Sequence, residues 1–155
     1  MYLTINLDQF DIYNILSSEK TKNNVMNNSD FYRLYLSSPE FISNGIFLNF
    51  TLNNVSIDKY FNKIKCSFDN TLNNNTIQNI SHIEKTILNK FNHINYSSCN
   101  RIQEQLNNNY IKIFDQTGIN LGKYNKLNIL LKISGIWSSI PQKEYGLTFR
   151  FFIVK

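Results

Sequence analysis

The sequence predicts a β-rich chain of the α+β class, and three observations lead to that prediction. Apolar and polar residues alternate along most of 126–155, with a break at 138–144, as they do in the two half-buried strands of a hairpin. A stretch near the middle of the chain changes to the three-and-four spacing of an amphipathic helix. Several further strand-like runs precede that stretch, so the expected order is strands, one central helix and strands.

The first half of the chain contains four runs with strand character. They are residues 2–7, 31–37, 41–52 and 55–68. Asn44 and Gly45, inside the third run, predict a tight turn or a bulge. Residues 17–30 are polar and predict an exposed loop between the first two runs.

The central helix is predicted from one apolar stripe, with Thr76 as its N-cap. The stripe consists of Ile77, Ile80, Ile83, Ile87, Leu88, Phe91 and Ile94. Residues 101–106 have the pattern of one or two further helical turns. A short strand over 110–115 and a glycine-containing turn over 116–125 then lead into the C-terminal hairpin.

This order favours an OB-like Greek-key barrel of about five to seven strands with one central helix. The 155 residues fit a single domain, 1–155, and a hydrophobic content of 42% is enough for a core. The chain has 26 asparagines and no alanine, which is typical of an AT-rich genome. Asparagine is a poor helix former and a ready turn former, so this bias weakens the local signals.

No motif in the sequence predicts a reaction, and we expect the protein not to be an enzyme. His82 and His93 are eleven residues apart and lack a partner at metal-ligand spacing. Cys66 and Cys99 form no CxxC pair. The 11 carboxylates are scattered, and the Gly-rich phosphate-binding loops are absent. We therefore predict no catalytic residue, no metal and no cofactor.

The charge pattern points instead to a polyanionic partner. The net charge is +5 and the pI is about 9.2, and basic residues alternate with aromatic ones on several predicted strands. Single-stranded nucleic acid requires that mixture, because cations neutralise phosphates and flat rings stack on bases. The alternative explanation is an ordinary basic β-protein, with lysines on its solvent face and rings in its core.

Two segments resemble a known family. Residues 129–137 (ILLKISGIW) with 145–151 (YGLTFRF), and residues 31–35 (FYRLY) leading to Asn44-Gly45-Ile46, resemble the T7-type single-stranded DNA-binding proteins of large nucleocytoplasmic DNA viruses. The resemblance implies an OB-fold, sequence-independent binding of single-stranded DNA and a role in viral DNA replication or recombination. It would place the protein inside the host cell, in the cytoplasm or at a viral replication site.

The resemblance and the charge together select seven candidate binding residues. They are Arg33, Tyr35, Lys63, Lys65, Lys132, Trp137 and Arg150. The basic side chains would contact phosphates and the rings would stack on bases. Trp137 lies on the more apolar face of its strand, which favours a core position over a stacking role.

One departure from the family supports a different function. T7-type proteins end in an acidic tail that recruits partners, whereas this chain ends in the apolar run 151–154 followed by a lysine. An apolar strand at an unprotected sheet edge pairs with other chains. The alternative prediction is therefore a structural or assembly protein, such as a virion component or a subunit of a larger complex, with a homo-oligomer formed through that edge. No run is long and apolar enough to predict a membrane span.

Overall fold

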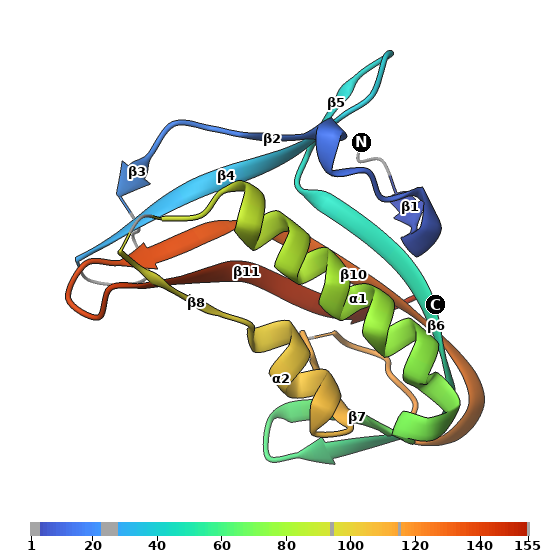
Figure 1. Ribbon diagram of the computed structural model, residues 1–155. Coiled ribbons are helices and arrows are strands. Elements are labelled where there is room, and N and C mark those ends of the chain that lie inside the picture. Colours follow the sequence, from blue (N-terminus) through green and yellow to red (C-terminus); the bar gives the residue numbers. More distant parts are fainter. Residues whose placement is uncertain (1–3, 23–27, 94, 115, 155) are drawn as a thin grey trace.

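The computed structural model describes residues 4–22, 28–93, 95–114 and 116–154, and these residues form a strand-rich structure with two α-helices (Figure 1). The strands are β1 (Thr4–Asn6), β2 (Ile15–Ser17), β3 (Thr21–Lys22), β4 (Ser29–Ser37), β5 (Ile42–Asn44), β6 (Ile46–Tyr60), β7 (Lys63–Phe68), β8 (Ser97–Cys99), β9 (Tyr110–Ile113), β10 (Gly122–Ser139) and β11 (Glu144–Ile153). The α-helices are α1 (Asn70–Lys90) and α2 (Arg101–Asn107), and short 3-10 turns cover Leu7–Gln9 and Ile12–Asn14.

All the strands belong to one mixed sheet, whose main path runs β1-β6-β7-β9-β11-β10-β4-β2. An additional pairing joins β10 to β6, so the sequence of neighbours β6-β7-β9-β11-β10 returns to β6. We call these five strands the five-strand circuit. Its connections are antiparallel except for the one between β9 and β11, which is parallel and consists of the single pair Ile113↔Phe151.

The strands of the five-strand circuit contribute to the core because alternate residues of each strand are buried. Leu48 of β6, Ile111 of β9 and Leu131 of β10 are fully buried, and Phe151 of β11 is 1% exposed. Helix α1 lies across one face of these strands, in front of β10 and β11 in Figure 1, and its buried residues Ile80 and Ile87 belong to the same core.

Two buried polar side chains fix the helices. Asn73 of α1 accepts a hydrogen bond from the N–H of Asn53 and donates one to its carbonyl, which holds the first turns of α1 against β6. Glu84 of α1 is fully buried and accepts from the N–H groups of Ile102 and Gln103, both at 2.9 Å. A carboxylate at the N-terminus of α2 satisfies two otherwise unpaired N–H groups and opposes the positive end of the helix dipole.

The β-rich α+β class and the helical turns over 101–106 are confirmed, while two predicted boundaries and the expected single helix are wrong. Residues 55–68 are not one strand: β6 continues to Tyr60, and the chain reverses at Phe61, whose φ of 54° is in the left-handed region. Helix α1 begins at Asn70, with Asp69 as its N-cap, and not after Thr76. The two turns predicted over 101–106 form α2, so the structure has a second helix.

Other predicted elements agree with the structure. Gly45 has a φ of 97° and separates β5 from β6, as the Asn-Gly signal indicates. The C-terminal hairpin is β10 and β11, in continuous antiparallel register from Ile129↔Ile153 to Ser139↔Glu144 apart from one irregularity at Ile133/Gly135. The polar segment predicted as a loop over 17–30 contains the two-residue strand β3, and its residues 23–27 lie outside the described residues. Within the described part of the chain, neither α-helix is long and apolar enough to cross a membrane.

Candidate nucleic-acid interface

The strands of the five-strand circuit carry eight basic residues; besides Lys59 of β6 and Lys123 and Lys126 of β10, five lie on β7, β9, β11 and the middle of β10. On each strand the neighbouring residue is buried: Cys66 is 0% exposed beside Lys65, and Ile111 is 0% exposed beside Lys112. Because side chains alternate along a strand, the basic residues must lie on the opposite, outer surface. We call this outer surface the basic face and define it by Lys63, Lys65, Lys112, Lys132 and Arg150.

Strand register aligns four of these residues across the sheet. Lys65 of β7 is opposite Lys112 of β9, and Arg150 of β11 is opposite Lys132 of β10. Lys112 and Arg150 each immediately precede a member of the pair that joins β9 to β11. The four cations therefore follow one another in register on four successive strands of the five-strand circuit, at ~4.8 Å per strand.

Aromatic rings lie directly beside these cations. The Lys65 Nζ is 4.4 Å from the centre of the Tyr110 ring, and the Arg150 Cζ is 4.0 Å from that of Phe114. The Lys132 Nζ is 5.6 Å from the Phe47 ring, the residue opposite it on β6. Cation–π contacts of this kind orient a charged side chain while leaving its N–H donors directed to solvent.

The positive charges of the basic face are not neutralised by ion pairs with acidic residues in the described part of the chain. Among the described residues the only ion pair is Lys20–Asp30, at 4.0 Å and away from this surface. Asp58 of β6 is opposite Lys65 in the β6–β7 register, but the two form no ion pair. Unpaired cations on one surface create a positive potential that attracts a polyanion.

Arg33 and Tyr35 extend this surface onto β4. Arg33 is exposed, and its guanidinium donates to the Asn44 Oδ1 at 3.2 Å. Tyr35 pairs with Gly45, and a side chain at Gly45 would lie 3.7 Å from the Lys132 Cε. The Asn44-Gly45 turn thus lies between these two residues and Lys132.

Of the seven predicted binding residues, Trp137 is the one that is buried in the structure. Its side chain is only 3% exposed, and the Arg101 Cζ lies 4.5 Å from its ring. A ring that is already covered on its face offers no area for stacking. The core position favoured by the apolar strand pattern is what the structure shows.

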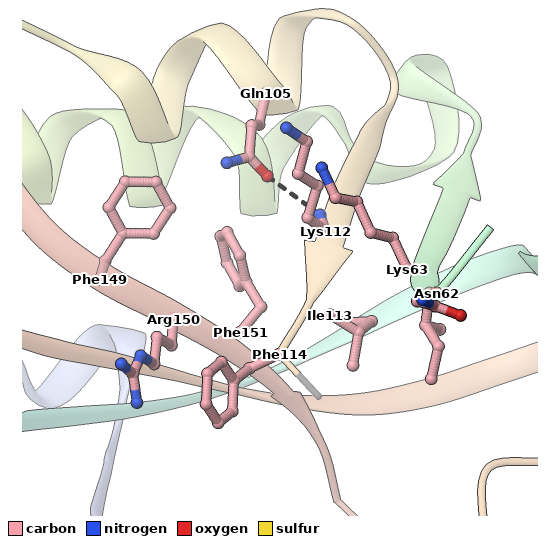
Figure 2. A pocket seen from close by; sticks show the side chains of 10 residues that line it. Asn62, Lys63, Gln105, Lys112, Ile113, Phe114, Phe149, Arg150 and Phe151 are labelled. Carbon is pink, nitrogen blue, oxygen red and sulfur yellow. Dashed lines mark hydrogen bonds between the residues drawn. The ribbon is translucent and has the colours of Figure 1, made fainter. Parts of the chain in front are cut away.

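An open hollow of about 340 Å³ interrupts the basic face between β9 and β11 (Figure 2). We call it the slit. It exists because the two strands share one residue pair and then diverge, so that the N–H of Lys112 bonds to the Gln105 Oε1 of α2, at 3.0 Å, and not to β11. The slit is lined by Asn62, Lys63, Ile64, Gln105, Lys112, Ile113, Phe114, Phe149, Arg150 and Phe151.

Sequence reasoning missed several residues of this site. Lys112 and Phe114 alternate with buried residues on a very short strand, and that period-two signal was available. Phe149 and Gln105 meet only in the folded chain, and no local pattern joins them. Tyr60 and Phe61 are 66% and 83% exposed at the β6–β7 turn, where their rings form an edge-to-face pair next to Asn62 of the slit.

Two fully buried titratable side chains, Cys66 and Glu84, have raised pKa values. Burial raises the pKa of the Cys66 thiol to about 12, so it stays protonated and unreactive. Burial also raises the pKa of Glu84, but both of its oxygens are occupied by backbone N–H groups. In residues 4–22, 28–93, 95–114 and 116–154, no three histidine, cysteine or carboxylate side chains gather closely enough to hold a metal ion.

Comparison of the chain with protein-family models, with curated proteins and with solved structures found no match. The basic face and the slit are therefore the features from which a function can be inferred.

Proposed function

We propose that the protein binds single-stranded DNA without strong sequence preference, as a protein of viral DNA replication or recombination. The observation that supports the proposal is the row of Lys65, Lys112, Arg150 and Lys132, in which unpaired cations lie beside exposed or half-exposed rings. Cations along a sheet surface bind the phosphates of a flexible strand, and rings between them stack on its bases. No part of this arrangement reads base identity at several positions, which supports sequence-independent binding.

The fold we propose is an OB-like barrel formed by the five-strand circuit. Taken in chain order, its strands are joined first–second–third–fifth–fourth–first, with the third and fifth parallel. That order supports an OB-like barrel, a five-stranded and partly open Greek-key structure whose second and third strands face its ligand. The second and third strands here are β7 and β9, which carry Lys63, Lys65 and Lys112. The helices lie between these two strands in the chain.

Salt dependence of binding tests the proposal. Fluorescence anisotropy of a labelled oligo-dT of about 12 nucleotides, within the ~4–16 nucleotides of an OB-fold site, would be measured between about 50 and 200 mM salt. If each of the five cations of the basic face neutralises one phosphate, log K plotted against log salt concentration has a slope of about −3.5, from ~0.7 per phosphate. Failure to bind at the lowest salt concentration would refute the proposal.

The second candidate function is that of a structural or assembly protein. The sequence favours it through the apolar run 151–154, which we expected at an unprotected sheet edge, and the structure does not show such an edge there. The C-terminal strand β11 pairs with β10 on one side and with β8 and β9 on the other. Near its end, the Gln116 side chain accepts from the N–H of Ile153 and donates to its carbonyl. The run 151–154 is therefore not an unprotected edge, and the reason is tertiary pairing that the sequence does not display.

A different edge still favours assembly. Leu16 of β2, and Phe41 and Ile42 at β5, are 45%, 41% and 62% exposed on the two short strands that flank the end of β4. Exposed apolar residues at strand edges promote pairing between chains. Analytical ultracentrifugation of the wild type and of an Ile42→Lys variant tests this candidate: a dimer that the variant abolishes supports it, and a monomer at all concentrations refutes it.

A further inference from the structure

The slit between β9 and β11 combines apolar walls with a charged rim. Phe151 is 1% exposed and Ile113 is 6% exposed, so the lining at these positions is apolar, and the ring of Phe149 stands half-buried beside them. Lys63, Lys112 and Arg150 also line the slit, and in Figure 2 the two lysine ammonium groups lie on one side of it and the Arg150 guanidinium on the other. The volume of about 340 Å³ is at the lower end of the ~300–1,000 Å³ typical of small-molecule sites.

The side-chain amide of Gln105 lines the slit with a fixed orientation and a free N–H donor. The Gln105 Oε1 accepts the N–H of Lys112 at 3.0 Å, which positions the side-chain amide. Its Nε2 donates to no residue in the described part of the chain, and in Figure 2 this nitrogen points from α2 toward the Phe149 side of the slit. Because the oxygen is already engaged, the amide is a donor at this position and not an acceptor.

We propose that the slit holds one nucleobase of the bound strand, with its plane against the Phe149 ring and a base carbonyl accepting from the Gln105 Nε2. This inference rests on the proposed function. The rim cations would bind the phosphates on either side of the inserted base. Thymine, cytosine and guanine each carry an exocyclic carbonyl oxygen, whereas adenine offers only ring nitrogens as acceptors, so a site shaped for a carbonyl favours the first three over adenine.

The experiment compares labelled dT and dA oligonucleotides of equal length against three proteins: the wild type, Gln105→Glu and Asn107→Asp. Gln105→Glu keeps the oxygen that accepts from Lys112 but replaces the donor by a second acceptor. Asn107→Asp adds the same charge to the same helix at an exposed position that does not line the slit, and is the matched control. Self-stacking of dA affects all three proteins equally, so the ratio of the two affinities isolates the slit.

We expect Gln105→Glu to reduce the dT/dA affinity ratio by about 5-fold, within the range of one hydrogen bond, and Asn107→Asp to leave that ratio at the wild-type value. A Phe149→Leu variant, which keeps an apolar filling, should weaken binding of both oligonucleotides by about 10-fold through lost stacking. Thermal unfolding of each variant would establish that it is folded.

The two ways of failing are distinct. If the wild type binds both oligonucleotides in a salt-dependent manner but Gln105→Glu leaves the ratio unchanged, or Phe149→Leu binds as the wild type does, the slit does not hold a base and the proposed function stands. If the wild type binds neither oligonucleotide at low salt, both proposals are refuted.

Discussion

Charged side chains are exposed and without ion pairs on the basic face, whereas the one at the contact between α1 and α2 is buried and hydrogen-bonded. On the basic face, Lys63, Lys65 and Arg150 are exposed and have no ion pair among the described residues. Between the helices, Glu84 is 0% exposed, and both of its oxygens accept backbone N–H groups.

The difference shows which charges are available for a ligand. Burying a carboxylate is unfavourable unless hydrogen bonds compensate for the lost water. The N–H groups of Ile102 and Gln103 provide these bonds to Glu84, and they thereby stabilise the packing of α2 against α1. The exposed cations gain little stability from their neighbours, and their N–H donors remain free to bind phosphate. Variants of the two regions should therefore separate stability from binding.

The largest expected effect is the loss of binding when the cation row is reversed. A variant with Lys65→Glu, Lys112→Glu and Arg150→Glu should bind oligo-dT about 1,000-fold more weakly than the wild type, because three phosphate contacts become repulsive. The matched control reverses Lys22, Lys85 and Lys143, which are exposed on β3, on α1 and at the β10–β11 turn. If the two variants lose affinity equally, net charge and not the basic face governs binding.

A smaller effect, on stability and not on binding, is expected at Glu84. Glu84→Gln retains one acceptor oxygen and turns an NH₂ group toward a backbone N–H, so the free energy of unfolding should fall by about 1–3 kcal/mol. Chemical denaturation would measure this change. The control is Glu104→Gln, which alters an exposed carboxylate on α2. Equal stability of the two variants would show that Glu84 does not hold the helices together.

The same carboxylate should give the stability a pH dependence. Desolvation by burial raises the pKa of Glu84 above its ordinary value of 4.5, although the N–H groups of Gln103 and Ile102 oppose the shift. The folded state then binds more protons than the unfolded state between the two pKa values. The wild-type free energy of unfolding, relative to that of Glu84→Gln, should fall as pH rises from 4.5 through the folded pKa. A difference that rises with pH would contradict this assignment.

The smallest expected effect is that of removing a single exposed cation. Lys63→Gln should change the free energy of unfolding by less than about 0.5 kcal/mol, because this side chain is exposed and unpaired. It should also make the salt slope of oligo-dT binding less negative by about 0.7. A slope identical to that of the wild type would exclude Lys63 from the set of phosphate contacts.

The sequence predicts the elements with a strong period more reliably than it predicts how they join. The alternation from Leu127 to Ile133 specifies which residues of β10 face the core, and the basic residues it leaves outside include Lys132. The predicted start of α1 is too late because its first turns are rich in asparagine, which is a weak helix former. The hydrogen bond that fixes these turns, between Asn73 and Asn53, exists only in the folded chain.

For the candidate site too, the sequence predicts positions along a strand but not the contacts between elements. Exposed positions such as Lys63, Lys65 and Arg150 can be predicted from alternation along a strand. The slit could not be predicted, because it depends on the divergence of β9 from β11 and on Gln105 reaching Lys112 from a different element. Trp137 is buried because Arg101, 36 residues earlier in the chain, lies against its ring.

NMR titration of isotope-labelled protein with oligo-dT tests the central claim most directly. The account predicts that backbone shifts concentrate on the residues of β7, β9, β10 and β11 that carry the basic face, with little change along the exposed side of α1. Shifts that concentrate on α1, or on the β2–β5 edge, would contradict it.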